Sequence, residues 1–169
     1  ADGRVFVAQG GTHTIGVFAA DDGRRLRTLG EGRGAGERQL YGPAGVALSA
    51  DGGTLFIADS GNHRVAVWRA ADGAPLRRIG GGAGSGPGQL RYPRGLALSP
   101  DGAELFVVDW GNHMVSVFEP RTGRHLRSWG RRGSGAGEFN GPSYCALSRD
   151  GRALFVADTR NHRVVACDA

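Results

Sequence analysis

The sequence predicts an all-β fold assembled from repeated four-stranded antiparallel sheets, the arrangement of blades in a β-propeller. Three observations lead to this expectation. A segment Asp-x-x-Asn-His-x-Val returns every 49 or 50 residues, strand-forming segments fill each period, and a glycine-rich segment separates one period from the next. A period of this length without any helical periodicity is typical of propeller blades.

The frame of the repeat follows from equivalent residues. Gln9, Asp59, Asp109 and Asp158 are 50, 50 and 49 residues apart, so the 169 residues hold about 3.4 repeats. Because a closed propeller needs roughly four to eight blades, we expect a partial or open ring of about 3.5 repeats. Its expected units are two complete blades between two partial ones: residues 1–30, 31–80, 81–130 and 131–169.

The unit at residues 45–80 contains four strand-forming segments. The first, GVALS, alternates small and aliphatic residues and ends at an Asp-Gly turn. The second, LFIAD, is apolar almost throughout, as expected of a strand covered on both faces by neighbouring sheets. RVAVWR carries a bulky residue at every other position, and PLRRIG follows another Asp-Gly turn, so these segments supply the third and fourth strands.

The other units repeat this order. The next one reads GLALS, LFVVD, MVSVFE and HLRSWG, whereas the last reads YCALS, LFVAD and RVVACD and has no fourth strand. The first unit has VFVAQ, TIGVFA and RLRTLG, which correspond to second, third and fourth strands. The sequence therefore predicts 14 strands in units of three, four, four and three.

The recurring tripeptides Asn62-His63-Arg64, Asn112-His113-Met114 and Asn161-His162-Arg163 resemble the Asn-His-Leu motif of NHL repeats, a β-propeller family. The rest of that family's pattern is also present, from the glycine-rich loop through the proline and the Asp-Gly turn to the apolar-Ala-Asp segment. In the first copy Gln9 and Thr12 replace the aspartate and asparagine. The resemblance implies one of three roles: a protein-interaction platform, an RNA-binding module, or a peptidyl-amidating lyase with a metal-bearing channel.

The motif residues are interpreted as structural. Aspartate accepts hydrogen bonds from turn amides and asparagine tolerates left-handed backbone geometry, so the pair suits a tight turn. A catalytic dyad or metal site is built once, whereas these residues recur in every blade. The residues assigned to this structural motif are Asp59, Asn62, His63, Asp109, Asn112, His113, Asp158, Asn161 and His162.

The glycine-rich segments between blades are interpreted as connections. None joins a strand to a helix or carries the lysine followed by serine or threonine of a phosphate-binding P-loop, so no nucleotide cofactor is expected. Leu40, Leu90 and Phe139 at their ends are expected to fill apolar space between blades. No unique cluster of His, Asp or Glu falls on channel positions, and His125 falls on an outer strand, so no metal is expected.

The amino-acid composition gives further information on the class of protein. The chain has 21 arginines without a lysine against 16 acidic residues, and the excess is scattered, as coding bias would produce. Cys145 and Cys167 fall on first and third strands of one unit, too far apart for a disulfide. No segment has the roughly 20 apolar residues of a membrane span, so membrane insertion is not expected, and the sequence does not indicate a compartment.

Residues that depart from the repeat are the better candidates for a binding site. Arg94 and Ser143 stand where the second unit has Ala44, Tyr144 stands where two units have glycine, and Trp110 replaces Ser60 and Thr159. Met114 likewise replaces an arginine. Since first strands line a propeller's channel, Arg94, Ser143 and Tyr144 are expected to border its mouth, with Trp110 farther out. With the arginines of the neighbouring loops, the candidate binding residues are Arg91, Arg94, Trp110, Arg131, Arg132, Ser143 and Tyr144.

We expect a non-catalytic binding module that presents its loop-bearing face to a protein partner. Single-stranded RNA is the alternative ligand, because that face is mildly basic and carries aromatic residues. A metal-dependent lyase or hydrolase of the peptidyl-amidating type is the second alternative. An open array would also leave apolar sheet faces at its ends, to be covered by further blades of a longer chain or by self-association.

Overall fold

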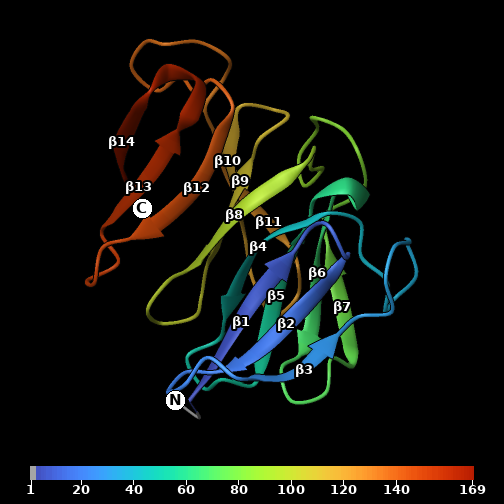
Figure 1. The fold of residues 1–169 in the computed structure, drawn as a ribbon. Helices are drawn as coiled ribbons and strands as arrows, with labels where there is room; N and C mark the ends of the chain where they lie inside the picture. The colour runs from blue at the N-terminus through green and yellow to red at the C-terminus, as the bar shows by residue number, and fades with distance from the viewer. Residues whose placement is uncertain (1–2) are drawn as a thin grey trace.

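The computed structural model describes residues 3–169 and shows four antiparallel sheets (Figure 1). The first sheet contains β1 (Arg4–Gln9), β2 (Thr14–Ala19) and β3 (Arg25–Leu29). The second contains β4 (Pro43–Leu48), β5 (Thr54–Asp59), β6 (Arg64–Arg69) and β7 (Pro75–Ile79). The third contains β8 (Pro93–Leu98), β9 (Leu105–Asp109), β10 (Met114–Phe118) and β11 (His125–Trp129), and the fourth contains β12 (Pro142–Leu147), β13 (Ala153–Asp158) and β14 (Arg163–Asp168).

The predicted strand inventory is confirmed. Each sheet is a meander in sequence order, and the first lacks an inner strand while the fourth lacks an outer one. Single 3-10 turns, η1 (Ser60–Asn62) and η2 (Thr159–Asn161), follow two of the second strands. In Figure 1 the chain passes from the first sheet in blue to the fourth in red, and the sheets do not close into a ring. The fold is therefore all-β and of propeller type, but open.

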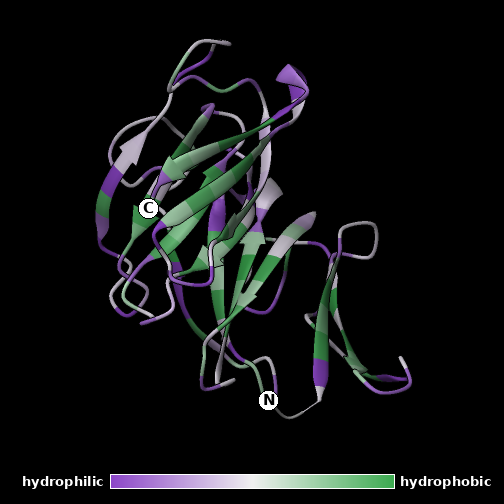
Figure 2. Cartoon of the chain, turned by 90° about the vertical axis from the view of Figure 1, so that its left-hand side faces the viewer, coloured by the Kyte–Doolittle hydropathy of each residue, from purple (hydrophilic) through white to green (hydrophobic). Residues whose placement is uncertain are grey.

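The tight turns follow from local chemistry. In the turn after β4, Asp51 accepts hydrogen bonds from the Ser49 hydroxyl and the Gly53 amide, while Gly52 takes a left-handed φ of 71°. The turns after β8 and β12 repeat this arrangement with Asp101 and Asp150. Figure 2 shows the result along the chain, with apolar strands joined by hydrophilic turns.

The apolar cores lie between consecutive sheets rather than inside one sheet. Leu40, Leu90 and Phe139, at the ends of the glycine-rich segments, are fully buried. Leu40 packs with residues of the first and second sheets, Leu90 with the second and third, and Phe139 with the third and fourth. Their predicted role as apolar fillers between blades is confirmed, and each connection thereby joins two sheets.

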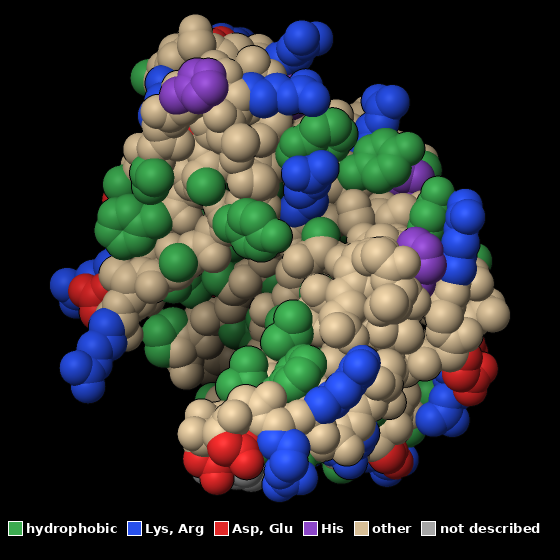
Figure 3. All heavy atoms as spheres, in the orientation of Figure 1, with side chains coloured by type: hydrophobic (Ala, Val, Ile, Leu, Met, Phe, Trp, Pro, Cys, Tyr) green, Lys and Arg blue, Asp and Glu red, His purple; other side chains and the backbone are tan. Residues whose placement is uncertain are grey.

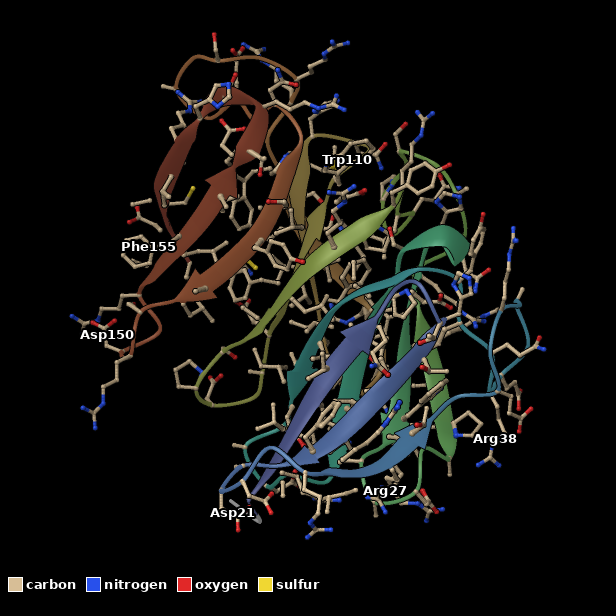
Figure 4. All side chains as sticks on the ribbon, viewed as in Figure 1. Asp21, Arg27, Arg38, Trp110, Asp150 and Phe155 are labelled. Atoms are coloured by element: carbon tan, nitrogen blue, oxygen red, sulfur yellow. The ribbon has the colours of Figure 1, made fainter. Side chains whose placement is uncertain are left out.

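The first and fourth sheets, at the two ends of the array, expose apolar faces. The equivalent faces of the inner sheets are covered by a neighbouring sheet. Phe155 on β13 is 43% exposed, whereas its equivalents Phe56 and Phe106 are 2% and 1% exposed. Val164 on β14 is 69% exposed, and Val5 on β1 is exposed at the other end. Figure 4 labels Phe155 at the outer side of the fourth sheet, and Figure 3 shows hydrophobic side chains along that edge. The strands at the two ends therefore have the apolar residues of buried strands, although no sheet covers those faces within residues 3–169.

Cys145 on β12 and Cys167 on β14 are both free, because β13 lies between their strands. This confirms the expectation that they do not form a disulfide with each other. Within residues 3–169 there is no helix with the length and apolar character needed to cross a membrane.

Candidate functional site

The Asp-x-x-Asn-His segment joins each glycine-rich loop to the sheet that follows it. Asp59 is fully buried, and one carboxylate oxygen accepts the backbone N–H of Tyr41 at 2.7 Å. The other oxygen accepts Asn62 Nδ2 at 2.8 Å and Arg64 Nε at 2.7 Å. Asn62 also donates to the carbonyl of Gly34 at 2.7 Å. Since buried carboxylates are stable only when hydrogen-bonded, this network holds the loop in one conformation.

The bonds from the loop N–H and from the asparagine recur around Asp109 and Asp158, which are also fully buried, whereas the arginine bond recurs only at Asp158. This recurrence supports a structural role for the motif. One detail of the prediction is wrong: the residue with left-handed geometry is the histidine, not the asparagine, with φ of 56° at His63 and 58° at His113. The asparagine stays in the 3-10 turn, because its amide must reach both the aspartate and the preceding loop.

The left-handed turn directs each histidine ring toward the next sheet. His13 Nδ1 accepts the backbone N–H of Gly42 at 3.0 Å, and His63 Nδ1 accepts that of Tyr92 at 3.1 Å. His113 Nδ1 accepts the N–H of Gly141 at 3.0 Å. The motif histidine is therefore a link between consecutive sheets. His162, in the fourth sheet, is exposed.

The hydrogen bond from Gly141 to His113, which links the third sheet to the fourth, lies close to two arginines. Burial lowers the pKa of His113, and the nearby charges of Arg132 and Arg160 lower it further, against the opposite effect of Asp158. The hydrogen bond also requires an unprotonated Nδ1, because that atom accepts the hydrogen bond that the Gly141 N–H donates. Two arginines near a histidine that must stay neutral indicate positive potential at the boundary of the third and fourth sheets.

Trp110 lies at the centre of an aromatic and cationic cluster on this surface. The guanidinium of Arg94 stands over its ring at 4.5 Å, and that of Arg160 at 5.0 Å. Tyr92 meets Trp110 edge-on with ring centroids 6.2 Å apart, and His63 meets Tyr92 at 4.4 Å. We call these five residues the aromatic–arginine ladder. Figure 4 labels Trp110 at the loop-bearing edge, where Figure 3 shows arginine beside hydrophobic side chains.

Tyr92 adopts a backbone conformation that costs energy. Its φ is 52°, whereas the equivalent positions in the neighbouring repeats are Gly42 and Gly141, both at 58°. Left-handed geometry at a bulky non-glycine residue is uncommon and costs on the order of 1 kcal/mol. The strain places the tyrosine ring between His63 and Trp110, so it serves the ladder rather than the fold.

The ladder borders a pocket. Its volume is about 360 Å³, and it is lined by residues of the ladder, the adjoining loop and the motif: His63, Ala83, Gly84, Ser85, Arg91, Tyr92 and Asn112. The largest of the described pockets, about 490 Å³, lies elsewhere, between Arg64, Trp68 and the outer strand β7. We favour the smaller pocket as part of the site, because His63 and Tyr92 of the ladder line it.

The structure brings together some of the predicted binding residues and separates others. Arg94 and Trp110 are in contact, and Arg91 lies against the neighbouring pocket. Ser143 is buried and hydrogen-bonded to Thr159, so its side chain faces the interior. Arg131 pairs with Glu138 at 2.9 Å within its own loop. Its neighbour Arg132 is exposed beside the His113 link.

The replacement of glycine by Tyr144 is explained by packing rather than by binding. A Cβ at Gly45 would lie 2.2 Å from the carbonyl oxygen of Arg94, and one at Gly95 would lie 2.6 Å from the Cα of Tyr144. Inner strands thus touch backbone to backbone, and only glycine fits. Tyr144 occupies the same position on the last inner strand, where no further strand packs, and its side chain is 55% exposed.

Sequence comparison within the chain missed two members of the ladder, although the same rule would have found them. Arg160 stands where the other repeats have Gly61 and Gly111, and Tyr92 stands where they have glycine. Both are departures from the repeat, as Trp110 is. His63 could not be found this way, because it obeys the motif and joins the ladder only through the folded geometry.

The described residues 3–169 contain no group of three or more His, Cys, Asp or Glu side chains placed to hold a metal ion. His125, on the outer strand β11, contacts Ser128 and Phe118 instead.

Comparisons with known proteins agree with this geometry. The model of the NHL repeat matches residues 40–68, which run from the buried Leu40 through β6. The chain therefore carries an NHL repeat, as its motifs indicate. A comparison with curated protein sequences found no relative.

Among solved structures, the chain is similar to hydrazine synthase of Kuenenia stuttgartiensis, with a TM-score of 0.73 and 18% sequence identity. The alignment covers 98% of this chain and 43% of that one, so the chain spans less than half the length of the protein it matches. At this identity the likeness establishes the fold alone.

Proposed function

We propose that this chain is a non-catalytic binding module that recognises an acidic segment of a protein partner through the aromatic–arginine ladder. The observation that carries the proposal is the stacking of Arg94 and Arg160 over Trp110. Guanidinium groups held against an aromatic ring are ordered in advance, so little side-chain entropy is lost when they bind a carboxylate.

The lack of carboxylate partners for Arg94 and Arg160 supports a ligand that carries carboxylates. Within residues 3–169, no Asp or Glu side chain pairs with Arg94 or Arg160, whereas Arg64, Arg127 and Arg163 all have carboxylate partners. Trp and Tyr beside arginine are also the residue types that dominate protein-binding surfaces. The ladder thus combines unpaired cationic groups with an apolar surface.

Selection from a random 12-residue peptide display library tests this function. We expect enrichment of sequences in which Asp or Glu accompany an aromatic or aliphatic residue. The Trp110→Ala variant should lose the enrichment, because both arginines lose the ring that orients them. Enrichment without acidic residues, or equal enrichment by the variant, would refute the proposal.

Single-stranded RNA is the second candidate, favoured by the same alternation of aromatic rings and guanidinium groups, which can combine base stacking with phosphate contacts. If RNA is the ligand, its affinity should fall steeply as salt rises and should fall again with Arg94→Ala or Arg131→Ala. Absence of binding to a mixed-sequence oligonucleotide at low salt would remove this candidate and leave the peptide proposal unaffected.

A further inference from the structure

The third repeat lacks a guanidinium that its neighbours contain. In the second repeat Arg64 Nε donates to Asp59 at 2.7 Å, Nη1 to Ala35 O at 3.1 Å, and Nη2 to Gly36 O and Gln39 O at 2.9 and 3.0 Å. In the fourth sheet Arg163 makes the equivalent four contacts with Asp158, Ser134 O, Gly135 O and Glu138 O. In the third repeat the residue at this position is Met114.

The acceptors of that missing group are still in place. Asn112 Nδ2 donates to Gly84 O at 2.7 Å, as Asn62 does to Gly34 O. The loop also keeps its internal bonds, from Gln89 N to Gly86 O and from Leu90 N to Gly82 O. Since the backbone follows the same course, the carbonyls of Ser85, Gly86 and Gln89 occupy the positions of those that hold Arg64.

Within residues 3–169, the carboxylate of this assembly has no cation bonded to it, although the charge of Arg91 lies close enough to lower its pKa. Asp109 is fully buried and keeps hydrogen bonds from Arg91 N and Asn112, but it has no guanidinium partner. Burial raises the pKa of Asp109 to about 6. For Asp158, burial also favours a higher pKa, but hydrogen bonds from Asn140, Asn161 and Arg163 outweigh it and lower the pKa. Of the hydrogen bonds that Asp158 accepts, only the one from Arg163 has no counterpart at Asp109.

Methionine does not fill the whole of the arginine's place. Its side chain lacks the carbon and two nitrogens that end a guanidinium group, which are the atoms that reach the loop carbonyls in the other repeats. The loop at residues 81–90 carries no charged side chain, and Arg91 beside it is exposed to solvent. A cation that takes the place of the arginine here would meet the Asp109 carboxylate and the loop carbonyl oxygens as acceptors.

We propose that the third repeat contains a receptor site for an external guanidinium group, formed by Asp109 and the carbonyls of Ser85, Gly86 and Gln89, and that an arginine of a bound protein segment occupies it. Guanidinium is preferred to ammonium because its planar fork matches acceptors that bind two arginines elsewhere in the chain. This inference deepens the proposed binding function, since it adds an arginine anchor beside the ladder.

Titration with methylguanidinium chloride at pH 7, followed by backbone amide NMR shifts, tests the site without any partner. We expect saturable shifts at residues 84–89 and 109–112. The loops at residues 34–39 and 133–138 should not respond, because Arg64 and Arg163 fill their sites. Sodium chloride at equal ionic strength is the control for screening.

Two variants make the test decisive. Met114→Arg should abolish the shifts, because the internal guanidinium takes the site. Arg64→Met should create a second responsive loop at residues 34–39. Shifts of equal size in all three loops, shifts that persist in Met114→Arg, or no saturable shift in the wild type would overturn the proposal. Any of these results leaves the binding of acidic peptides by the ladder to be judged separately.

Discussion

His113 Nδ1 accepts the backbone N–H of Gly141 at 3.0 Å, and this bond joins the third sheet to the fourth. Equivalent bonds join the earlier sheets, whereas His162 has the same left-handed geometry and is followed by no further sheet within residues 3–169. The histidine of the motif is thus a connector between blades. Comparing substitutions at His113 and His162 therefore measures how much the bond between sheets contributes to stability.

Replacing His113 with Ala should destabilise the chain by about 1–3 kcal/mol, because the Gly141 N–H loses its acceptor at a buried position. His162→Ala is the matched control, since it imposes the same left-handed strain on alanine without removing an inter-sheet bond. Urea denaturation of both variants measures the difference. Equal destabilisation would show that the ring serves its own turn rather than the junction.

Gly95→Ala should cost about 1–3 kcal/mol, because its Cβ would lie 2.6 Å from the backbone of Tyr144 and would force the inner strands apart. Gly11→Ala is the control, as a Cβ there meets no atom within 4 Å. Thermal denaturation distinguishes the two substitutions. If both glycines tolerate alanine equally, the inner strands do not pack as closely as the structure shows.

Met114→Arg should stabilise the chain at pH 7 by about 2 kcal/mol, because it supplies charge-assisted bonds to Asp109 and the adjoining loop. The wild-type Asp109 has a pKa of about 6, above the unfolded value of about 3.9, so the folded state binds more protons between these pH values. The contribution of Asp109 to the stability of the folded state therefore becomes less favourable as pH rises from 4 to 7.

The gain from Met114→Arg should accordingly be largest at pH 7 and smallest near pH 4, where Asp109 is protonated in the wild type. Comparing the variant with the wild type at each pH cancels the titration of other groups. Urea denaturation at four pH values measures this difference. A gain that does not change with pH would contradict the raised pKa of Asp109 in the wild type.

The exposed end faces should make this chain associate in solution, because the equivalents of Phe155 and Val164 are buried in the second and third sheets. Light scattering after gel filtration should show a mass that rises with concentration. The double variant Phe155→Ser/Val164→Ser should shift the chain toward the monomer. Leu76→Ser, which removes an exposed leucine from the outer strand β7, is the control and should not.

Much of the fold could be predicted from the sequence because each repeat confirms the others. The strand order, the missing strands at both ends and the buried positions of Leu40, Leu90 and Phe139 all follow from periodicity. The roles of the motif residues were harder to predict, because a turn motif does not show which residue takes the left-handed conformation. His63 does so and reaches Tyr92, which lies 29 residues away.

The site was predicted only in part, for a physical reason. Trp110 and Arg94 were found because they depart from the repeat, but departure alone does not separate a binding residue from one freed of a packing constraint. Tyr144 departs because no inner strand packs against it, and Ser143 turns inward to Thr159. Only the folded geometry shows that Arg160, from the next sheet, completes the ladder.

The most direct test of the ladder is the affinity of an acidic peptide, taken from the display selection, for two charge-matched variants. Arg94→Gln/Arg160→Gln should weaken binding by about tenfold or more, equivalent to at least about 1.4 kcal/mol, because it removes the guanidinium groups stacked on Trp110. Arg149→Gln/Arg152→Gln changes the net charge equally at the turn after β12 and should alter the affinity less than about twofold. Equal losses in the two variants would mean that net charge, rather than the ladder, binds the peptide.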